Sequence, residues 1–328
     1  MPAVRSFLVN AGQNPKKMSV EQRNLPSFSQ GKKVSHFTIQ GLVGAGGYGA
    51  IYSVIDNNNN EKYALKVESL NAEKEGLVNE IRTMYALKGN PYFPQLIDDG
   101  IFEDYRFLTM SIYGPSVCDL RHQMPEHKFS LKTGIILAIE MLKPIQELHK
   151  AGYIHCDIKP SNFLINPNAQ PFVVLIDFGL SQEYINRHNG KIREPRKGVG
   201  FVGTDRYASI NAHSSKRLSP RDDLMSWFYS LIEMLKGRLP WTGAGNHELV
   251  GKMKKKISRW TLCKNLPFEL QRVYSHIKSL GYADTPNFDH LTKLLQKSIK
   301  KIDNGNVKLD WETMGNENWN QPEVVPIE

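Results

Sequence analysis

Apolar and polar residues alternate along residues 37–68, which read FTIQGLVGAGGYGAIYSVIDNNNNEKYALKVE. A period of two residues is typical of a β-strand with one buried face. A glycine cluster and a run of asparagines interrupt the alternation, and both compositions favour turns. This part of the chain therefore predicts consecutive antiparallel strands.

The apolar period lengthens in residues 76–88, which read GLVNEIRTMYALK. Leu77, Ile81, Met84 and Leu87 then share one face of a helix. We expect this to be the one main helix of an otherwise strand-rich region.

Residues 101–113, IFEDYRFLTMSIY, alternate again and predict two further strands. Helical patterns dominate afterwards, as in residues 133–152, TGIILAIEMLKPIQELHKAG. A small strand-rich lobe thus precedes a larger helical one, and we predict an α+β fold.

Both ends of the chain lack a periodic apolar pattern. Residues 1–35 are polar and predict a flexible extension before an ordered body at 36–302. Residues 303–328 carry six acidic residues and one lysine, so this tail is expected to be either loose or docked on the body.

The chain is basic, with 42 Lys and Arg against 33 Asp and Glu and a net charge of +9. This balance favours acidic partners such as phosphopeptides, acidic proteins, nucleic acid or anionic lipid.

The three cysteines are widely spaced, which favours neither a disulfide framework nor a zinc site and fits a reducing compartment. No apolar run reaches the roughly 18 residues of a membrane span. We expect a monomeric protein of the cytoplasm, and also of the nucleus if the basic run 252–259 acts as a signal. A solvated helix face is the default interpretation of this run, and a docking site is a further alternative.

A glycine motif lies between two of the predicted strands. Gly44, Gly46 and Gly49 match G-x-G-x-x-G-x-V, with Ile51 at the last position. Glycine lets the backbone close over ATP phosphates with its N–H groups facing them. A dinucleotide fingerprint would open a helix instead. Alone the motif is weak, because glycine-rich hairpin turns also occur for structural reasons.

Two charged residues follow in a meaningful order. Lys66 lies on the next strand, where an ammonium can bridge the α and β phosphates of ATP. Glu80 lies on the following helix, where a carboxylate can hold that ammonium. Taken singly, each is more simply a solvated surface residue. Their order after the glycine motif reverses that preference.

Residues 153–165, YIHCDIKPSNFLI, contain the spacing H-x-D-x-K-x-x-N, and Asp177 begins DFG. Asp157 can accept a hydroxyl proton, and Lys159 can neutralise charge on a transferred phosphoryl group. Asn162 and Asp177 can bind Mg²⁺. Four motifs in the correct order make coincidence remote.

These motifs resemble those of eukaryotic protein kinases, and YGPSV, DIKPSNFLI, DFGLSQEY and GTDRYASINAH resemble the casein kinase 1 superfamily. GFVGTDRYASINAH is most similar to the tau-tubulin kinase branch. The resemblance covers residues 36–302. It implies a bilobal protein-kinase fold with an N-lobe at about 36–112 and a C-lobe at about 113–302. It also implies a non-specific serine/threonine protein kinase that uses ATP and Mg²⁺ and acts on protein substrates.

The resemblance assigns roles residue by residue. It implies that Met110 is the gatekeeper and that a hinge begins at Ser111, where the family usually has an acidic residue. It places Thr204 against Asp157 and Lys159, and Asp223 under the backbone of the catalytic loop. The residues implied around ATP are Leu42, Gly44, Gly46, Gly49, Ile51, Ala64, Lys66, Glu80, Met110, Ser111, Ile112, Tyr113 and Leu164.

Cys156 stands where most kinases carry an arginine. That arginine pairs with a phosphate on the activation segment and touches neither ATP nor the acceptor hydroxyl. We therefore predict activity without phosphorylation of the activation segment. A small buried apolar residue is the favoured interpretation of Cys156, ahead of a redox role.

The segment between Asp177 and Thr204 is rich in cations, which predicts a basic peptide groove. Its basic residues are Arg187, Lys191, Arg193, Arg196 and Lys197. The resemblance implies that Arg206 belongs to an anion pocket for acidic or phosphate-primed substrates. Residues 201–204 read FVGT, whereas tau-tubulin kinases have a sequence similar to FRGT there. Val202 therefore stands at the position of their arginine.

Alternative functions stay open at this stage. A pseudokinase scaffold is suggested by Cys156 and Ser111, although Lys66, Asp157 and Asp177 are all present. A nucleic-acid-binding module is suggested by the charge, but no recognition motif accompanies it, so nucleic acid is not expected as a partner. The acidic tail is a candidate to fold onto the basic groove, with a loose solubilising tail as the alternative.

Overall fold

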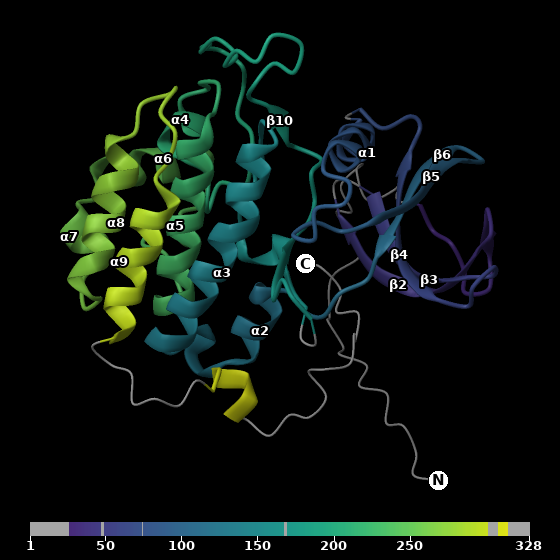
Figure 1. Cartoon of the computed structure of the whole chain (residues 1–328), viewed down its shortest axis with the longest axis horizontal. Coiled ribbons are helices and arrows are strands. Elements are labelled where there is room, and N and C mark those ends of the chain that lie inside the picture. The colour runs from purple at the N-terminus through teal and green to yellow at the C-terminus, as the bar shows by residue number, and fades with distance from the viewer. Residues whose placement is uncertain (1–25, 47–48, 74, 167–168, 301–307, 314–328) are drawn as a thin grey trace.

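The computed structural model describes residues 26–46, 49–73, 75–166, 169–300 and 308–313 (Figure 1). These residues form two lobes, one dominated by a sheet and the other by helices. The predicted α+β bilobal fold is therefore confirmed.

The small lobe contains a six-stranded antiparallel sheet with the order β1-β2-β3-β4-β6-β5. Helix α1, Gly76–Ala86, packs beside this sheet (Figure 1). The strands are β1 Lys33–Val34, β2 Phe37–Gly46, β3 Gly49–Asp56, β4 Lys62–Ser69, β5 Leu96–Phe102 and β6 Tyr105–Ser111.

Alternating side chains explain these strands. On β3, Ala50, Tyr52 and Val54 are buried, and Leu65 and Val67 of β4 pack in the same apolar cluster. The predicted face of α1 is also buried, from Leu77 to Leu87. Strand β5 begins at residue 96, before the predicted start at 101.

The ordered body begins earlier than the predicted boundary at residue 36. Phe28 is 8% exposed and stacks on Tyr52, with ring centroids 5.5 Å apart. The Phe28 N–H donates to the Tyr52 hydroxyl at 2.9 Å, and that hydroxyl donates to the Pro26 carbonyl at 2.7 Å. Phe28 thus anchors this part of the predicted extension on the small lobe, while most residues of 26–35 are exposed. The rest of the predicted extension lies outside the described residues.

The large lobe is built around α5, which is buried along nearly its whole length. Trp227 at its centre donates its indole N–H to the carbonyl of Ala138 on α3 at 3.0 Å. The α-helices of this lobe are α2 Val117–Gln123, α3 Leu131–Lys150, α4 Ile210–His213, α5 Pro220–Lys236, α6 His247–Lys256, α7 Arg259–Leu262, α8 Phe268–Ser279 and α9 Phe288–Lys300.

Short elements complete this lobe. The 3-10 helices are η2 Pro125–His127, η3 Pro160–Asn162 and η4 Asp310–Thr313. Two small antiparallel pairs join β7 Tyr153–Ile154 to β10 Gln182–Glu183 and β8 Phe163–Ile165 to β9 Val173–Leu175. No helix in the described ranges combines the length and apolar character that crossing a membrane requires.

The described part of the acidic tail docks at the start of α3, where η4 lies close to α2 and α3 (Figure 1). Asp310 accepts hydrogen bonds from the Ser130 N–H and hydroxyl, both at 2.6 Å, and from the Thr133 hydroxyl at 2.8 Å. Trp311 is 2% exposed and packs edge-on against Phe129. In Figure 1, η4 lies at the opposite end of the large lobe from β10 and α4, the elements on either side of the activation segment. The predicted contact of the tail with the basic groove stays a prediction for residues outside the described ranges.

Candidate active site

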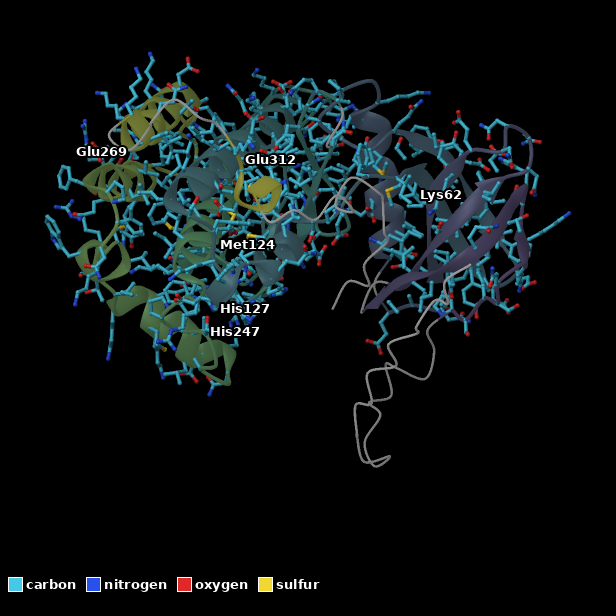
Figure 2. All side chains as sticks on the ribbon, turned by 90° about the horizontal axis from the view of Figure 1, so that it is seen from below. Lys62, Met124, His127, His247, Glu269 and Glu312 are labelled. Atoms are coloured by element: carbon cyan, nitrogen blue, oxygen red, sulfur yellow. The ribbon has the colours of Figure 1, made fainter. Side chains whose placement is uncertain are left out.

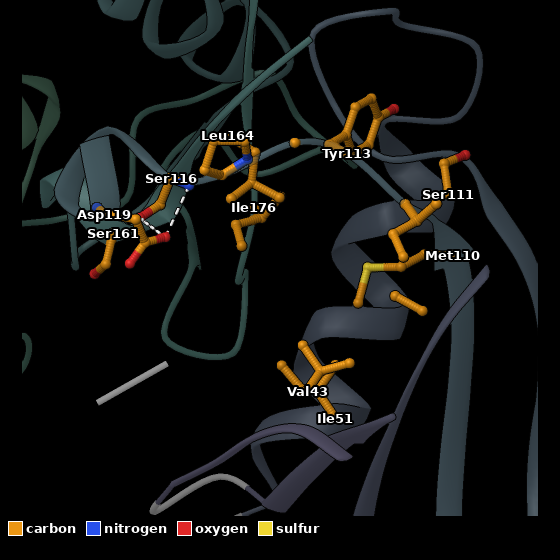
Figure 3. Close-up of a pocket in the computed structure, with 14 residues that line it drawn as sticks. Val43, Ile51, Met110, Ser111, Tyr113, Ser116, Asp119, Ser161, Leu164 and Ile176 are labelled. Atoms are coloured by element: carbon orange, nitrogen blue, oxygen red, sulfur yellow. Dashed lines mark hydrogen bonds between the residues drawn. The ribbon is translucent and has the colours of Figure 1, made fainter. Parts of the chain in front are cut away.

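A cavity opens between the two lobes, and its walls are mostly apolar. Figure 3 shows Val43 and Ile51 of the sheet on one side and Leu164 and Ile176 on the other. Met110, which precedes the hinge, lies on β6 between them. Two apolar walls with a strand of backbone between them suit a flat aromatic base. Further lining residues predicted from the sequence are Ala64, Ser111, Ile112 and Tyr113.

The prediction that Leu42 lines the ATP site is wrong. Its side chain is 58% exposed and does not line the cavity, whereas the neighbouring Val43 does. Successive side chains of a strand point to opposite faces, so a shift of one residue moves the assignment from one face to the other.

The glycine motif forms the ends of β2 and β3, where Gly44 pairs with Ile51 and Gly46 with Gly49. Gly49 has φ +108°, and a Cβ there would lie 1.9 Å from the carbonyl oxygen of Val67. Only glycine fits this position. Residues 47–48, between these strands, lie outside the described residues.

Lys66 lies at the centre of a buried ion triad. Its Nζ is 2.7 Å from Glu80 Oε2 and 3.0 Å from Asp177 Oδ1. Burial lowers the pKa of Lys66, but the charges of Asp177 and Glu80 outweigh burial and raise it. Burial raises the pKa of Asp177, yet the Lys66 ammonium brings it down to about 2. The triad therefore unites three predicted residues from β4, α1 and DFG.

The catalytic loop brings Asp157, Lys159 and Thr204 together. Asp157 Oδ1 accepts a hydrogen bond from the Thr204 hydroxyl at 2.7 Å, and Lys159 Nζ lies 2.8 Å from Asp157 Oδ2. Lys159 Nζ also donates to Thr204 Oγ1 at 3.4 Å. The three side chains form a connected polar group with a carboxylate at its centre. This is the arrangement that the sequence predicts.

Asn162 and Asp177 fit a Mg²⁺ site by their chemistry. The Asn162 side-chain N–H donates to the Asp157 carbonyl at 2.9 Å, which directs the amide nitrogen into the loop. Its side-chain oxygen remains for other partners. Asp177 directly follows Ile176, whose N–H donates to the Asn162 carbonyl at 2.9 Å, so the two residues lie on adjoining backbone. Oxygen donors of this kind are the ligands that Mg²⁺ prefers.

Asp223 on α5 supports the catalytic loop from below, as the resemblance implies. Its carboxylate accepts the backbone N–H groups of His155 at 2.8 Å and Cys156 at 2.9 Å, and lies 2.8 Å from His149 Nε2. Burial raises the pKa of Asp223, but the hydrogen bond and charge of His149 lower it overall. These bonds hold Cys156 at φ +69°, a conformation that L-residues rarely adopt.

Asn79 is a site residue that the sequence reasoning missed. Its side-chain nitrogen lies 3.2 Å from the Phe178 carbonyl, 3.0 Å from that of Gly179 and 2.8 Å from that of Ser181. It therefore ties α1 to the backbone after Asp177. The only available signal was a polar residue directly before Glu80 on the same helix.

Cys156 is 5% exposed and belongs to an apolar cluster with Tyr184 and Leu218, which we call the segment cluster. Its other buried members are Ile154, Ala208 and Ala212. Val202 packs against this cluster. Burial raises the pKa of the Cys156 thiol well above its usual value, which keeps it protonated. Cys156 is thus a buried apolar residue, as the favoured interpretation holds.

The cations of the activation segment differ in their surroundings. Arg193 pairs with Glu183, and Arg187 lies over the ring of Tyr153. Arg187 is nevertheless exposed, as are Lys191, Arg196 and Lys197. Arg206 is 45% exposed at its side chain and lies 3.4 Å from buried Glu233. The segment therefore presents an exposed basic surface. The buried carboxylate of Glu233 partly offsets the charge of Arg206.

Comparison with known proteins identifies a family and several relatives of this chain. The family described as protein kinase domain matches residues 37–303. A probable serine/threonine-protein kinase of Dictyostelium discoideum is 38% identical over 283 residues, which are 85% of this chain and 57% of that protein. This chain therefore spans little more than half of that relative.

Two further relatives carry informative names. The serine/threonine-protein kinase spe-6 of Caenorhabditis elegans is 33% identical over 77% of this chain and 69% of its own length. A probable casein kinase I homolog of Encephalitozoon cuniculi is 34% identical over 81% of this chain and 85% of its own length. The similarity to casein kinase I proteins agrees with the resemblance, and the finer likeness to tau-tubulin kinases stays a prediction.

Proposed function

On the premise that this chain belongs to the protein kinase family, with casein kinase I homologues among its relatives, we propose that it transfers the γ-phosphoryl group of ATP to serine or threonine residues of proteins. One observation carries the proposal. The carboxylate of Asp157 lies within hydrogen-bonding distance of both Thr204 and Lys159, the pair of side chains that the transfer requires beside it.

In this mechanism Asp157 accepts the proton of the substrate hydroxyl as its oxygen bonds to the γ-phosphorus. The bond from that phosphorus to the bridging oxygen breaks, and ADP leaves. Lys66 binds the α and β phosphates, and Lys159 offsets charge on the transferred group. Mg²⁺, when bound, neutralises phosphate charge, and Asn162 and Asp177 would hold it.

The direct test is radiolabelled phosphate transfer to casein by purified protein. We expect Lys66→Met and Asp177→Asn to nearly abolish transfer, because the first removes the phosphate contact and the second a metal ligand. Circular dichroism checks that both variants fold. Undiminished transfer by Asp177→Asn, with contaminating kinases excluded, would overturn the proposal.

The proposed kinase is active without phosphate on its activation segment. Cys156 and Val202, two positions where related kinases carry arginine, both pack in or against the segment cluster. An apolar cluster orders the segment by burial, which requires no phosphate. Cations that a phosphate could pair with at these positions are absent.

Matched cysteine variants test this role of the segment cluster. Cys156→Ser and Cys263→Ser each place a hydroxyl in a buried apolar site, at a cost of about 1–3 kcal/mol. Only Cys156→Ser should speed amide hydrogen exchange in residues 199–208, because Cys263 lies in a different cluster. Equal exchange in the two variants would contradict the role of the cluster.

Acidic or phosphate-primed acceptors are the proposed substrate class, supported by the exposed basic surface of the segment. Arg206→Ala should slow primed peptides more than unprimed ones, since a guanidinium binds phosphate through charge-assisted hydrogen bonds. Arg272→Ala, an exposed arginine of α8, is the matched control and should change neither rate. Equal rates of the wild-type protein on matched acidic and neutral peptides would overturn this preference.

A further inference from the structure

A cluster of two imidazoles and a carboxylate lies beside the activation segment. Asp205 directly follows Thr204, His213 ends α4, and His247 begins α6. Each residue offers a ligand atom, and these atoms lie within 4.8 Å of one another. Figure 2 shows His247 at the margin of the large lobe, where its side chain is 41% exposed. The cluster is therefore open to ions from solvent.

The geometry is close to that of a metal site. His247 Nδ1 lies 2.5 Å from Asp205 Oδ1, and the two imidazole rings are 4.5 Å apart. Four ligands around zinc at about 2.0–2.2 Å would lie about 3.4 Å from one another. The side chains of His247 and Asp205 are 41% and 45% exposed, so a metal ion can reach both from solvent.

His213 is the fixed member of the cluster. Its ring packs against Gly251 of α6, where a Cβ would come within 3.2 Å of Nδ1. Phe201 lies against this ring and that of His247, with centroid distances of 5.4 and 4.2 Å. Among the described residues, buried Nδ1 has no hydrogen-bond partner. Packing against Gly251 and Phe201 thus holds the His213 ring in place.

Lys254 is the nearby cation that a metal ion would compete with. Its Nζ lies 3.2 Å from His213 Nε2, and it also donates to the carbonyls of Asp205 at 2.5 Å and Ala208 at 2.7 Å. The ring of Trp241 lies 5.0 Å from the same nitrogen. Lys254 therefore keeps two strong acceptors and an aromatic face if a metal ion replaces it at His213 Nε2.

We propose that Asp205, His213 and His247 bind a divalent transition-metal ion of the zinc class, with the remaining coordination position open to solvent. Two imidazole nitrogens and one carboxylate oxygen are a ligand set that zinc accepts. This site is separate from the oxygen ligands Asn162 and Asp177, which suit Mg²⁺. Bound metal would join the activation segment to α4 and α6. The inference goes beyond the proposed function, because binding can be measured without any kinase assay.

The test uses chelator-treated, metal-free full chain. Zinc affinity is measured by competition with a chromophoric chelator, and the coordination of Co²⁺ by its visible spectrum. We expect one equivalent of zinc and a tetrahedral Co²⁺ spectrum. His247→Gln and Asp205→Asn should each weaken zinc binding by about tenfold or more, because each removes a direct ligand.

His290→Gln is the matched control, because His290 and His276 form an imidazole pair 5.1 Å apart that is not joined by a third ligand among the described residues. It should leave zinc affinity unchanged. His247→Gln should also keep the melting temperature and the metal-free peptide rate near those of wild type, which shows that the site is not simply unfolded. Equal zinc affinity in wild type and His247→Gln, or loss of binding in His290→Gln alone, would overturn the proposal.

Discussion

Removal of the Asp223 carboxylate tests how the catalytic loop is held. Asp223 is 2% exposed and accepts the N–H groups of His155 and Cys156. Asp223→Ala leaves both donors buried without a partner, and each costs about 1–3 kcal/mol. The free energy of unfolding should therefore fall by about 2–6 kcal/mol, measured by urea denaturation with tryptophan fluorescence.

The same change should slow catalysis, because Asp157 directly follows the two residues that lose their support. A loss of about 1.4 kcal/mol in positioning corresponds to about tenfold in rate, so we expect kcat for peptide phosphorylation to fall by tenfold or more. Asp223→Asn keeps one acceptor oxygen and should lie between wild type and Asp223→Ala in both measurements. If Asp223→Ala does not fold, Asp223→Asn alone tests the prediction.

Asp289→Ala is the matched control, because it removes an exposed carboxylate from α9. It should lower the free energy of unfolding by at most about 1 kcal/mol, the usual contribution of a carboxylate in the first turn of a helix. Asp223→Ala with wild-type stability and wild-type kcat would refute the view that this carboxylate organises the loop.

Three further predictions concern other parts of the molecule. Trp311→Ala should cost about 3–5 kcal/mol in a denaturation curve, since the ring is buried, while kcat stays near wild type. Thr204→Val should lower kcat in steady-state assays by removing the hydroxyl that contacts Asp157, and Thr204→Ser should restore it. The pKa of Asp177, lowered to about 2 mainly by Lys66 against the effect of burial, gives stability that is complete above the unfolded pKa near 4 and is lost as pH falls toward 2. Acid denaturation of Asp177→Asn should lack this component.

The sequence predicted those features whose pattern is local. The strands of residues 37–68 and the buried face of α1 follow from a regular apolar period, which the backbone geometry imposes. Lys66, Glu80 and Asp177 were predicted because their order matches a known set of motifs. Their contacts at 2.7 and 3.0 Å could not follow from order alone.

Features that depend on contacts between distant parts of the chain were either not predicted or assigned to the wrong residue. Phe28 and Trp311 lie in polar surroundings in the sequence, and only tertiary packing buries them. Leu42 and Val43 are both apolar, so composition could not tell which faces the cavity. Asn79 resembles an ordinary polar helix residue until the backbone after Asp177 is placed beside it.

Cys156 could be interpreted as a small buried residue, but its partners could not be predicted. Val202, Tyr184 and Leu218 come from parts of the chain up to about sixty residues away, and the fold collects them around the catalytic loop. Cys156 and Val202 are thus parts of one apolar cluster beside the catalytic loop.

The central claim is that this chain is an active serine/threonine kinase whose site is assembled without phosphate. The most direct measurement is peptide phosphorylation by phosphatase-treated protein that mass spectrometry shows to be unphosphorylated, with Asp157→Asn assayed beside it. We expect the treated wild type to keep most of its activity and to modify serine or threonine, while Asp157→Asn does not. Activity that vanishes on dephosphorylation and returns on rephosphorylation between Leu180 and Arg206, or equal rates for wild type and Asp157→Asn, would contradict it.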